Sequence, residues 1–429
     1  MNYKETLNWL FNQLPMYQRQ GKAAYKADLK NTYELDEYFN YPHQKFKSIH
    51  VAGTNGKGSV SHMLASVLQE SGYKVGLYTS PHLKDFRERI RINGEMVTEE
   101  FVVNFINNHK TKFEEIKPSF FEMTVAMAFE YFAKRNVDVA IIEVGMGGRL
   151  DSTNIIKPDL SIITNIGLDH TTFLGNSLAE ISIEKAGVIK NEIPVIIGET
   201  HKETESIFKN IAQEKQSEIH FADQFYSIDY EMLSIDNKQI FNIKHYSDIV
   251  YKDLKLDLLG NYQKKNLLTL LRSIDILKKN GYNIKNQAIY SGLERVSNNT
   301  SLKGRWQVLG YNPMIICDTA HNLEGITFVI NQINQIPHKN LHIVFGVVDD
   351  KDVGKILNIL PKNARYYFTK ADIPRALDQR ILKSKAEKFG LFGESFEKVN
   401  IALLEAKKNA KDKDLIFIGG STFVVAEVV

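Results

Sequence analysis

The chain has 429 residues, with 54 basic and 51 acidic side chains and a formal net charge of +3. This length is too great for one ordinary hydrophobic core, so we expect two domains, and the balanced charge gives no indication of nucleic-acid binding. The single cysteine, Cys317, excludes an internal disulfide and is typical of a reducing compartment. Neither a signal peptide nor an apolar run of about 18 residues is recognisable, so we expect a cytoplasmic protein without membrane contact.

Short apolar segments alternate with amphipathic segments over the first two thirds of the chain, which predicts a mostly parallel sheet covered by helices. Residues 79–94 are polar and are expected to be a long connection. Residues 218–258 alternate with a period of two, which predicts a small antiparallel sheet. We expect strands at 47–51, 73–78, 137–144, 160–164 and 194–197, and helices at 57–69, 101–113, 121–133 and 262–279.

A polar, turn-rich segment at residues 297–304 is the predicted linker between the domains. The alternation of strands and helices starts again beyond it, with strands expected at 314–317, 341–345, 365–369 and 415–418. The predicted fold class is therefore α/β: an N-terminal P-loop ATPase domain over 1–296, with a mostly parallel sheet and a small antiparallel sheet, and a smaller Rossmann-like α/β domain over 305–429.

The segment HVAGTNGKGSVSHML at residues 50–64 combines a strand end, a glycine-rich loop with one lysine, and a helix start. It departs from the full P-loop pattern because Val51 stands at the first glycine position and Gly58 replaces the Ser or Thr that binds magnesium. The physical requirements for binding phosphate remain: backbone N–H groups that can converge on an anion, a helix N-terminus and the charge of Lys57. We therefore predict a phosphate site.

Ligands for magnesium must then come from other positions, and three polar side chains follow predicted strands. These are Ser80, Glu143 and His170. Open α/β sheets bind ligands beyond the carboxyl ends of their strands, and magnesium prefers oxygen ligands, so the imidazole is the weakest of the three. The segment from Gly145 does not match the dinucleotide-binding pattern G-x-G-x-x-G, because the third glycine falls at 148 rather than 150.

An ordered set of motifs resembles the folylpolyglutamate synthases, including the form that also acts as dihydrofolate synthase, within the ATP-dependent Mur ligase superfamily. The motifs are GTNGKGS at 53–59, TSPHL at 79–83, ERIRING at 88–94, EVGMGGRLDSTN at 143–154, GLDH at 167–170, EKAGVIK at 184–190, Gly304-Arg305 and DTAHN at 318–322.

The resemblance implies ATP and Mg²⁺ as cofactors and assigns site residues. It implies that Lys57, Lys185 and His321 are catalytic, with His321 beside the phosphates or the incoming glutamate. It implies that Ser80, Glu143 and His170 hold magnesium and that Lys185 is carbamylated, which would make it an anion able to bind a second magnesium. The implied ATP contacts are Thr54, Asn55, Gly56, Lys57, Gly58, Ser59, Asn266, Arg305 and Asp318.

The pterin-bearing substrate is expected against the segment after Thr79 and Ser80 and against Ser119–Glu122. Phe120 and Phe121 either offer an aromatic surface for a flat ring or are core residues. The carboxylate of Glu122 either accepts hydrogen bonds from the edge of the pterin or caps the following helix. The resemblance adds Leu150, Asp151 and Ser152 for dihydropteroate and Ser421 for glutamate. Residues 22–38 depart from the family pattern, which leaves the preference between dihydropteroate and tetrahydrofolate open.

The implied reaction joins a carboxylate to an amine: ATP phosphorylates the carboxylate and the amine of glutamate attacks the acyl phosphate. One alternative is a Mur-type ligase acting on another carboxylate, although no UDP-binding domain is recognisable. A P-loop kinase leaves the second domain unexplained, and a nucleotide-binding module without activity leaves Glu143, His170 and Lys185 unexplained. We expect small-molecule partners, no nucleic acid, and a monomer.

Overall fold

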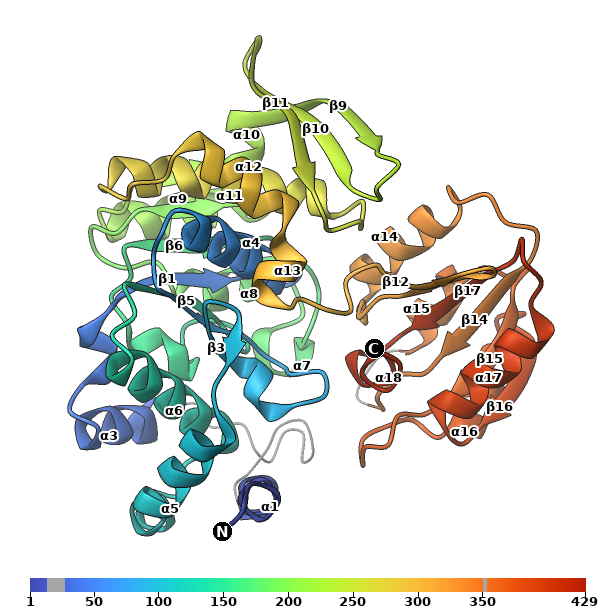
Figure 1. The fold of residues 1–429 in the computed structure, drawn as a ribbon, viewed down its shortest axis with the longest axis horizontal. Helices are drawn as coiled ribbons and strands as arrows, with labels where there is room; N and C mark the ends of the chain where they lie inside the picture. Colours follow the sequence, from blue (N-terminus) through green and yellow to red (C-terminus); the bar gives the residue numbers. More distant parts are fainter. Residues whose placement is uncertain (14–27, 350–352) are drawn as a thin grey trace. The chain divides into compact units, whose positions relative to one another are not determined.

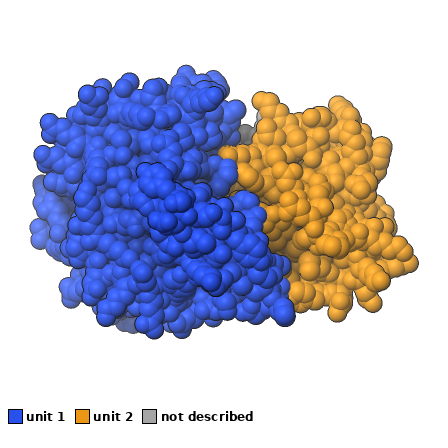
Figure 2. Space-filling model, turned by 90° about the horizontal axis from the view of Figure 1, so that it is seen from above, with its two compact units in different colours: residues 1–257, 263–302 blue, residues 258–262, 303–429 orange. Residues whose placement is uncertain are grey.

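The computed structural model describes residues 1–13, 28–349 and 353–429. The chain forms two compact units, which Figure 2 shows in different colours. The first unit comprises Met1–Asp257 and Gln263–Leu302, and the second comprises Leu258–Tyr262 and Lys303–Val429. Of the segment that departs from the family pattern, residues 22–27 lie outside the described residues, and Lys30–Tyr38 forms helix α3.

The first unit is built on a sheet with the strand order β4-β3-β2-β5-β1-β6-β7-β8. Six neighbouring strands, β2, β5, β1, β6, β7 and β8, pair in parallel, as the sequence predicts. Apart from the edge strand β8, their central residues are buried, which explains why they are almost continuously apolar. The strands are β1 (Lys47–Ala52), β2 (Val75–Tyr78), β3 (Ile90–Ile92), β4 (Glu95–Met96), β5 (Val139–Glu143), β6 (Leu160–Ile163), β7 (Val195–Ile197) and β8 (Ile219–Phe221).

Helices cover this sheet (Figure 1). One core cluster joins β2 and β5 to α5 and α6, and another joins β6 and β7 to α8 and α9. Helix α4 is buried from Ser59 to Leu68, because it contacts the sheet as well as α11, α12 and α13. The helices are α1 (Tyr3–Gln13), α3, η2 (Pro42–Lys45), α4 (Lys57–Glu70), η3 (Phe86–Arg89), α5 (Glu99–Ile116), α6 (Phe120–Lys134), η4 (Ser152–Ile155), α7 (Thr171–Leu174), α8 (Leu178–Ala186), α9 (Glu205–Glu214), α10 (Ala222–Phe225), α11 (Gln263–Lys279), α12 (Asn286–Glu294) and α13 (Val296–Thr300).

A separate antiparallel sheet of β9 (Tyr226–Leu233), β10 (Gln239–His245) and β11 (Asp248–Leu256) confirms the prediction for residues 218–258. The expectation for residues 79–94 is wrong in one respect: this segment is not only a connection. Its Ile90–Ile92 forms β3, which pairs antiparallel with β2. Three residues are too few to show a period, and the surrounding charges of ERIRING conceal the strand.

The second unit is a mixed α/β sheet with the order β12-β13-β17-β14-β15-β16, in which only the pair β12–β13 is antiparallel in the described part. All four predicted strands are present, which confirms the Rossmann-like class, and β12 and β16 were not predicted. The elements are β12 (Gln307–Tyr311), β13 (Met314–Cys317), α14 (Leu323–Ile333), β14 (Leu341–Phe345), α15 (Val353–Ile359), β15 (Arg365–Thr369), α16 (Gln379–Glu387), β16 (Gly393–Phe396), α17 (Val399–Asn409), β17 (Leu415–Gly419) and α18 (Thr422–Ala426).

The division into units differs from the expected domains in two places. Most of the segment expected as a linker, residues 297–304, belongs to the first unit, where helix α13 includes Val296–Thr300. A short segment, Leu258–Tyr262, belongs to the second unit. Leu259 packs against the core of the second unit, and the Tyr262 hydroxyl donates a hydrogen bond of 2.6 Å to Asp318. These contacts hold the segment there although 40 residues of the first unit follow it in the sequence.

Candidate functional site

The glycine-rich loop connects β1 to α4 and has the conformation that an anion-binding loop needs. Gly56 precedes α4 with φ of +85°, a left-handed conformation that side chains rarely adopt. A Cβ atom at Gly56 would lie 2.2 Å from Oδ1 of Asn266, so glycine is also required by the close approach of α11. The structure thus brings Asn266 against the loop, next to the N-terminus of α4.

Residues after β6 hold this loop from the other side. The backbone N–H of Thr54 donates to the carbonyl of Asn165 at 3.0 Å, and that of Asn55 donates to the Asn165 side chain at 2.8 Å. The hydroxyl of Thr54 also bonds with Gly167. Sequence reasoning missed Asn165; the signal was a pair of polar residues, Thr164-Asn165, directly after a buried and mostly apolar strand.

Two lysine amines share one acceptor in this loop. Nζ of Lys57 donates to the carbonyl oxygen of Gly53 at 3.0 Å, and Nζ of Lys185 donates to the same oxygen at 2.8 Å. The two nitrogens therefore lie within about 6 Å of each other, where like charges disfavour each other's charged form. Burial and the charge of Lys57 lower the pKa of Lys185 to about 7.

Lys185 reaches the loop because the segment after β5 packs closely on the end of α8. A Cβ atom at Gly148 would lie 2.9 Å from the carbonyls of Glu184 and Lys185, and one at Gly187 would lie 2.3 Å from Cα of Arg149. The side-chain amide of Asn154 donates to the carbonyl of Gly187 at 3.0 Å. The glycines of EVGMGGRLDSTN and EKAGVIK thus serve a close approach of two backbones.

Ser80 and Glu143 lie together, as predicted, because β2 and β5 are neighbours in the sheet. The backbone N–H of Ser80 donates to Oε2 of Glu143 at 3.0 Å. Glu143 is 4% exposed and pairs in register with Val51, two residues before the glycine-rich loop. His170 follows β6, the strand on the other side of β1, and precedes the short helix α7.

These residues fit magnesium by the chemistry of their donors. A buried carboxylate with a neighbouring hydroxyl at the edge of a phosphate loop is an ordinary donor set for this ion. Among residues 1–13, 28–349 and 353–429, no three His, Cys, Asp or Glu side chains gather in a way that could hold a metal ion. The predicted set contains only two residues of those types, Glu143 and His170, and otherwise relies on a hydroxyl and on a modified lysine.

The expected pterin side of the site differs in part from the prediction. Phe120 is 3% exposed, and its ring lies 5.6 Å from Phe11 and 5.9 Å from Phe86, so it is a core residue and not an aromatic surface. Phe121 is half-buried, and its ring lies over Gly145, where a Cβ atom would approach within 2.4 Å. Glu122 forms a capping box with Ser119, which is the structural alternative of the two considered.

Asp151 is buried and holds the segment after β5 in place. Its Oδ1 accepts hydrogen bonds from the N–H and hydroxyl of Thr153, and its Oδ2 accepts one from the N–H of Met146 at 2.9 Å. The next residue, Ser152, is also buried and starts η4, whereas Leu150 is partly exposed. Burial raises the pKa of Asp151, and hydrogen bonds from Thr153 and Met146 oppose this shift.

Four predicted residues belong to the second unit, where the strands β13 and β17 pair in parallel. Asp318 follows β13 and accepts hydrogen bonds from the hydroxyl of Tyr262 and the N–H groups of Trp306 and Ala320. The side chains of Arg305 and His321 bond with the hydroxyl and the carbonyl of Thr319, respectively. Ser421 follows β17 and caps α18. Thr79, the last of the predicted contacts, belongs to the first unit, and its N–H bonds with the carbonyl of Arg89.

Comparison with known proteins agrees with this geometry. Residues 51–272 match the Mur ligase middle domain, and residues 304–422 match the Mur ligase glutamate ligase domain. The chain is 31% identical over 437 residues to the dihydrofolate synthase/folylpolyglutamate synthase of Bacillus subtilis, covering 99% of this chain and 98% of that protein. The chain belongs to the folylpolyglutamate synthase/dihydrofolate synthase family of Mur ligases.

Two further relatives illustrate the family. A probable bifunctional folylpolyglutamate synthase/dihydropteroate synthase of Haloferax volcanii is 33% identical over all of this chain, which spans half of that protein. A crystal structure of the Yersinia pestis bifunctional folylpolyglutamate synthase/dihydrofolate synthase, complexed with AMPPNP and a Mn ion, has a TM-score of 0.83 at 27% identity. The similarity covers 100% of this chain and 97% of that one. The match to both Mur ligase domains argues against the P-loop kinase alternative.

We predict that Lys57→Ala abolishes ATP turnover without unfolding the protein. The substitution removes the only charged side chain of the loop 53–59, which we expect to contact phosphate, and loss of a single such group costs about 100-fold or more in turnover. Release of ADP measured under saturating substrates tests this, with circular dichroism as the check of folding.

The matched control is Lys157→Ala, which removes an exposed lysine outside the loop and is expected to keep wild-type turnover. ADP release by Lys57→Ala within a factor of three of the control would contradict the assignment of this loop to ATP.

Proposed function

We propose that the protein is an ATP-dependent ligase that adds L-glutamate to reduced folates, and that dihydropteroate is a second acceptor. The observation that carries the proposal is the arrangement around the Gly53 carbonyl. A phosphate loop, two lysine amines and the Ser80–Glu143 pair meet at the carboxyl ends of neighbouring strands. The full-length similarity to the Bacillus subtilis enzyme supports the choice of substrates.

In the proposed reaction, a substrate carboxylate oxygen attacks the γ-phosphorus of ATP and ADP leaves. The amine of glutamate then attacks the acyl carbon, phosphate leaves, and an amide bond results. Each step brings anions together, so positive charge and N–H donors must offset their repulsion. The loop from Thr54 to Ser59 and Asn266 would hold the phosphates, with Lys57 placing its charge on them.

The magnesium ligands of this proposal are Ser80, Glu143 and His170 for one ion and a carbamylated Lys185 for a second. When bound there, magnesium would neutralise charge on the phosphoryl oxygens during transfer. Glu143 contributes its buried carboxylate, and the N–H of Ser80 fixes one of its oxygens.

Carbamylation of Lys185 would resolve the charge conflict at Gly53. The ammonium group first loses one proton, and the neutral amine nitrogen then forms a bond to the carbon of CO₂ and loses a second proton, so that a cation becomes an anion. That anion would then lie within reach of Lys57, the neighbouring cation on the same carbonyl. The burial of Lys185, 4% exposed, would protect the carbamate from water.

The remaining assignments are proposed on the strength of the family motifs. Arg305 and Asp318 would contact the nucleotide, and His321 and Ser421 would contact the phosphates or glutamate. The folate side would be lined by Thr79, Ser119, Phe121, Leu150 and Ser152, while Glu122 and Asp151 would act there mainly by holding the backbone.

Among the described residues, we find no helix with the length and apolar character that a membrane span requires. We propose a cytoplasmic monomer that acts on small molecules alone.

The direct test incubates the protein with ATP, magnesium and glutamate, and with either dihydropteroate or a reduced folate. We expect ADP, phosphate and a product heavier by one glutamyl unit by mass spectrometry. Absence of glutamylated product with both acceptors would overturn the proposal. ADP formation that needs the acceptor but not glutamate would point instead to a kinase.

We predict that Lys185→Ala loses most ligase activity and that short carboxylic acids such as acetate restore part of it. The small side chain leaves a space in which a free carboxylate can replace the carbamate. The measurement is product formation against acetate concentration, with Lys190→Ala treated in parallel, because Lys190 is another lysine of the same motif. Wild-type activity of Lys185→Ala without added acid would refute the carbamate.

A further inference from the structure

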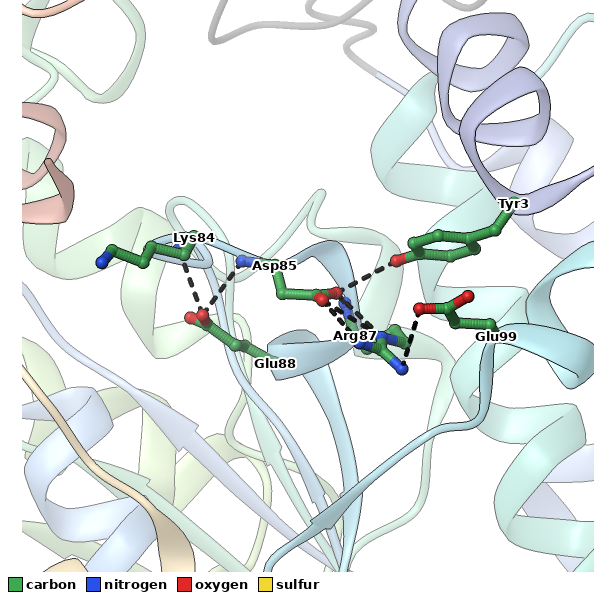
Figure 3. Close-up of polar contacts among 6 residues, drawn as sticks. All are labelled: Tyr3, Lys84, Asp85, Arg87, Glu88 and Glu99. Atoms are coloured by element: carbon green, nitrogen blue, oxygen red, sulfur yellow. Dashed lines mark hydrogen bonds and ion pairs between the residues drawn. The ribbon is translucent and has the colours of Figure 1, made fainter.

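A compact turn over residues 82–89 follows Ser80, and we propose that Tyr3 on helix α1 positions this turn through Asp85. Tyr3 would thereby act as a positioning residue for the folate side of the site (Figure 3). The inference rests on the proposed function, because it is that function which assigns Ser80 to magnesium and the segment after it to the pterin. The motifs TSPHL at 79–83 and ERIRING at 88–94 include neither Tyr3 nor Asp85.

The turn is closed internally by Glu88. Its carboxylate accepts hydrogen bonds from the backbone N–H groups of Leu83 at 2.7 Å, Lys84 at 3.1 Å and Asp85 at 3.0 Å. The three bonds define the shape of the turn, but all of them lie within it. They leave its position relative to the rest of the unit to be determined by other contacts.

Asp85 supplies a hydrogen-bonded contact that reaches outside the turn to helix α1. Its carboxylate caps η3 at the N–H of Arg87, pairs with the Arg87 guanidinium at 2.7 Å, and accepts a hydrogen bond of 3.0 Å from the Tyr3 hydroxyl. The guanidinium also lies 5.4 Å from the centre of the Tyr3 ring and 3.4 Å from the carboxylate of Glu99, at the start of α5. Burial and the charge of Asp85 raise the pKa of Tyr3, so the phenol stays protonated and donates.

Helix α1 is a firm support for this hydrogen bond. Thr6 and Leu10 are fully buried, and α1 packs against α5. The ring of Phe11 lies 5.6 Å from Phe120, the first residue of α6, and 6.4 Å from His82 of the turn. The hydroxyl of Tyr3 is therefore presented by a helix that is itself part of the core of the unit.

The base of the turn is hydrogen-bonded to Thr79, directly before Ser80. Nε of Arg89 donates to Nδ1 of His82 at 2.8 Å, and the carbonyl of Arg89 accepts a hydrogen bond of 3.0 Å from the N–H of Thr79. Arg89 is 2% exposed, so this base is embedded in the unit. A turn that shifts at Asp85 would therefore move the segment after Ser80, which the proposed function assigns to the folate, whereas Ser80 and Glu143 are held by the ends of the neighbouring strands β2 and β5.

The test is Tyr3→Phe, which removes the hydroxyl and keeps the ring beside Arg87. We expect the KM for the reduced folate to rise about three- to tenfold, because the hydrogen bond that is lost has a charged acceptor. The KM for ATP should stay within about 1.5-fold of wild type and kcat within about twofold, because the phosphate loop makes its contacts elsewhere.

Two comparisons separate positioning from a general loss of stability. In a double-mutant cycle with Asp85→Asn, the combined variant should be no worse than Asp85→Asn alone, because Tyr3 acts through that carboxylate. Tyr33→Phe, which removes the hydroxyl of a tyrosine that is 57% exposed, should leave both KM values unchanged. Additive effects in the cycle, or an equal rise in the KM for ATP, would overturn the inference.

A measurement of amide hydrogen exchange tests the positioning role of Tyr3 even if the protein does not ligate folates. In Tyr3→Phe, the amides of residues 83–87 should exchange at least about threefold faster than in wild type, whereas those of the phosphate loop should not change. Unchanged exchange in the turn would overturn the positioning role. Absence of ligase activity in the wild type would overturn only the proposed function.

Discussion

The arrangement on which the candidate site depends is the meeting of two lysine amines at the carbonyl oxygen of Gly53. Lys57 starts α4 after the phosphate loop and Lys185 lies in the last turn of α8, so neither helix alone creates the contact. Two ammonium groups so close, one of them buried, are unfavourable unless one loses its charge or becomes an anion. A carbamate on Lys185 would meet that requirement and supply a magnesium ligand.

The surrounding structure is arranged to bring these amines together. Gly53 and Gly56 allow the loop to turn close to Thr164 and Asn266, and Gly148 and Gly187 allow the segment after β5 to lie against the end of α8. Asp151 fixes the same segment through its bonds to Thr153 and Met146. Glycine has no side chain that would prevent the close approach, and the buried carboxylate of Asp151 accepts hydrogen bonds from backbone N–H groups. Together these features determine where Lys185 lies.

Much of this could be predicted from the sequence, because it depends on local patterns. Buried parallel strands are apolar runs, and polar residues that end neighbouring strands meet at one edge, which is why Ser80 and Glu143 lie together. Contacts that depend on packing could not be predicted in this way. The sequence leaves Phe120 open between a ligand surface and a core residue, and the contact with the ring of Phe11 decides for the core. The strand Ile90–Ile92 is too short for its pairing with β2 to be visible in the sequence. The segment at 258–262 has no local signal that it belongs to the second unit.

The most direct measurement of the central claim is ¹³C NMR of the wild-type protein equilibrated with ¹³C-labelled bicarbonate and magnesium. The account predicts a carbamate resonance from a slowly exchanging site that is absent from Lys185→Ala and present in Lys190→Ala. A spectrum without such a resonance, recorded on protein that is active as a ligase, would contradict the account. It would show that the two amines at Gly53 coexist without carbamylation.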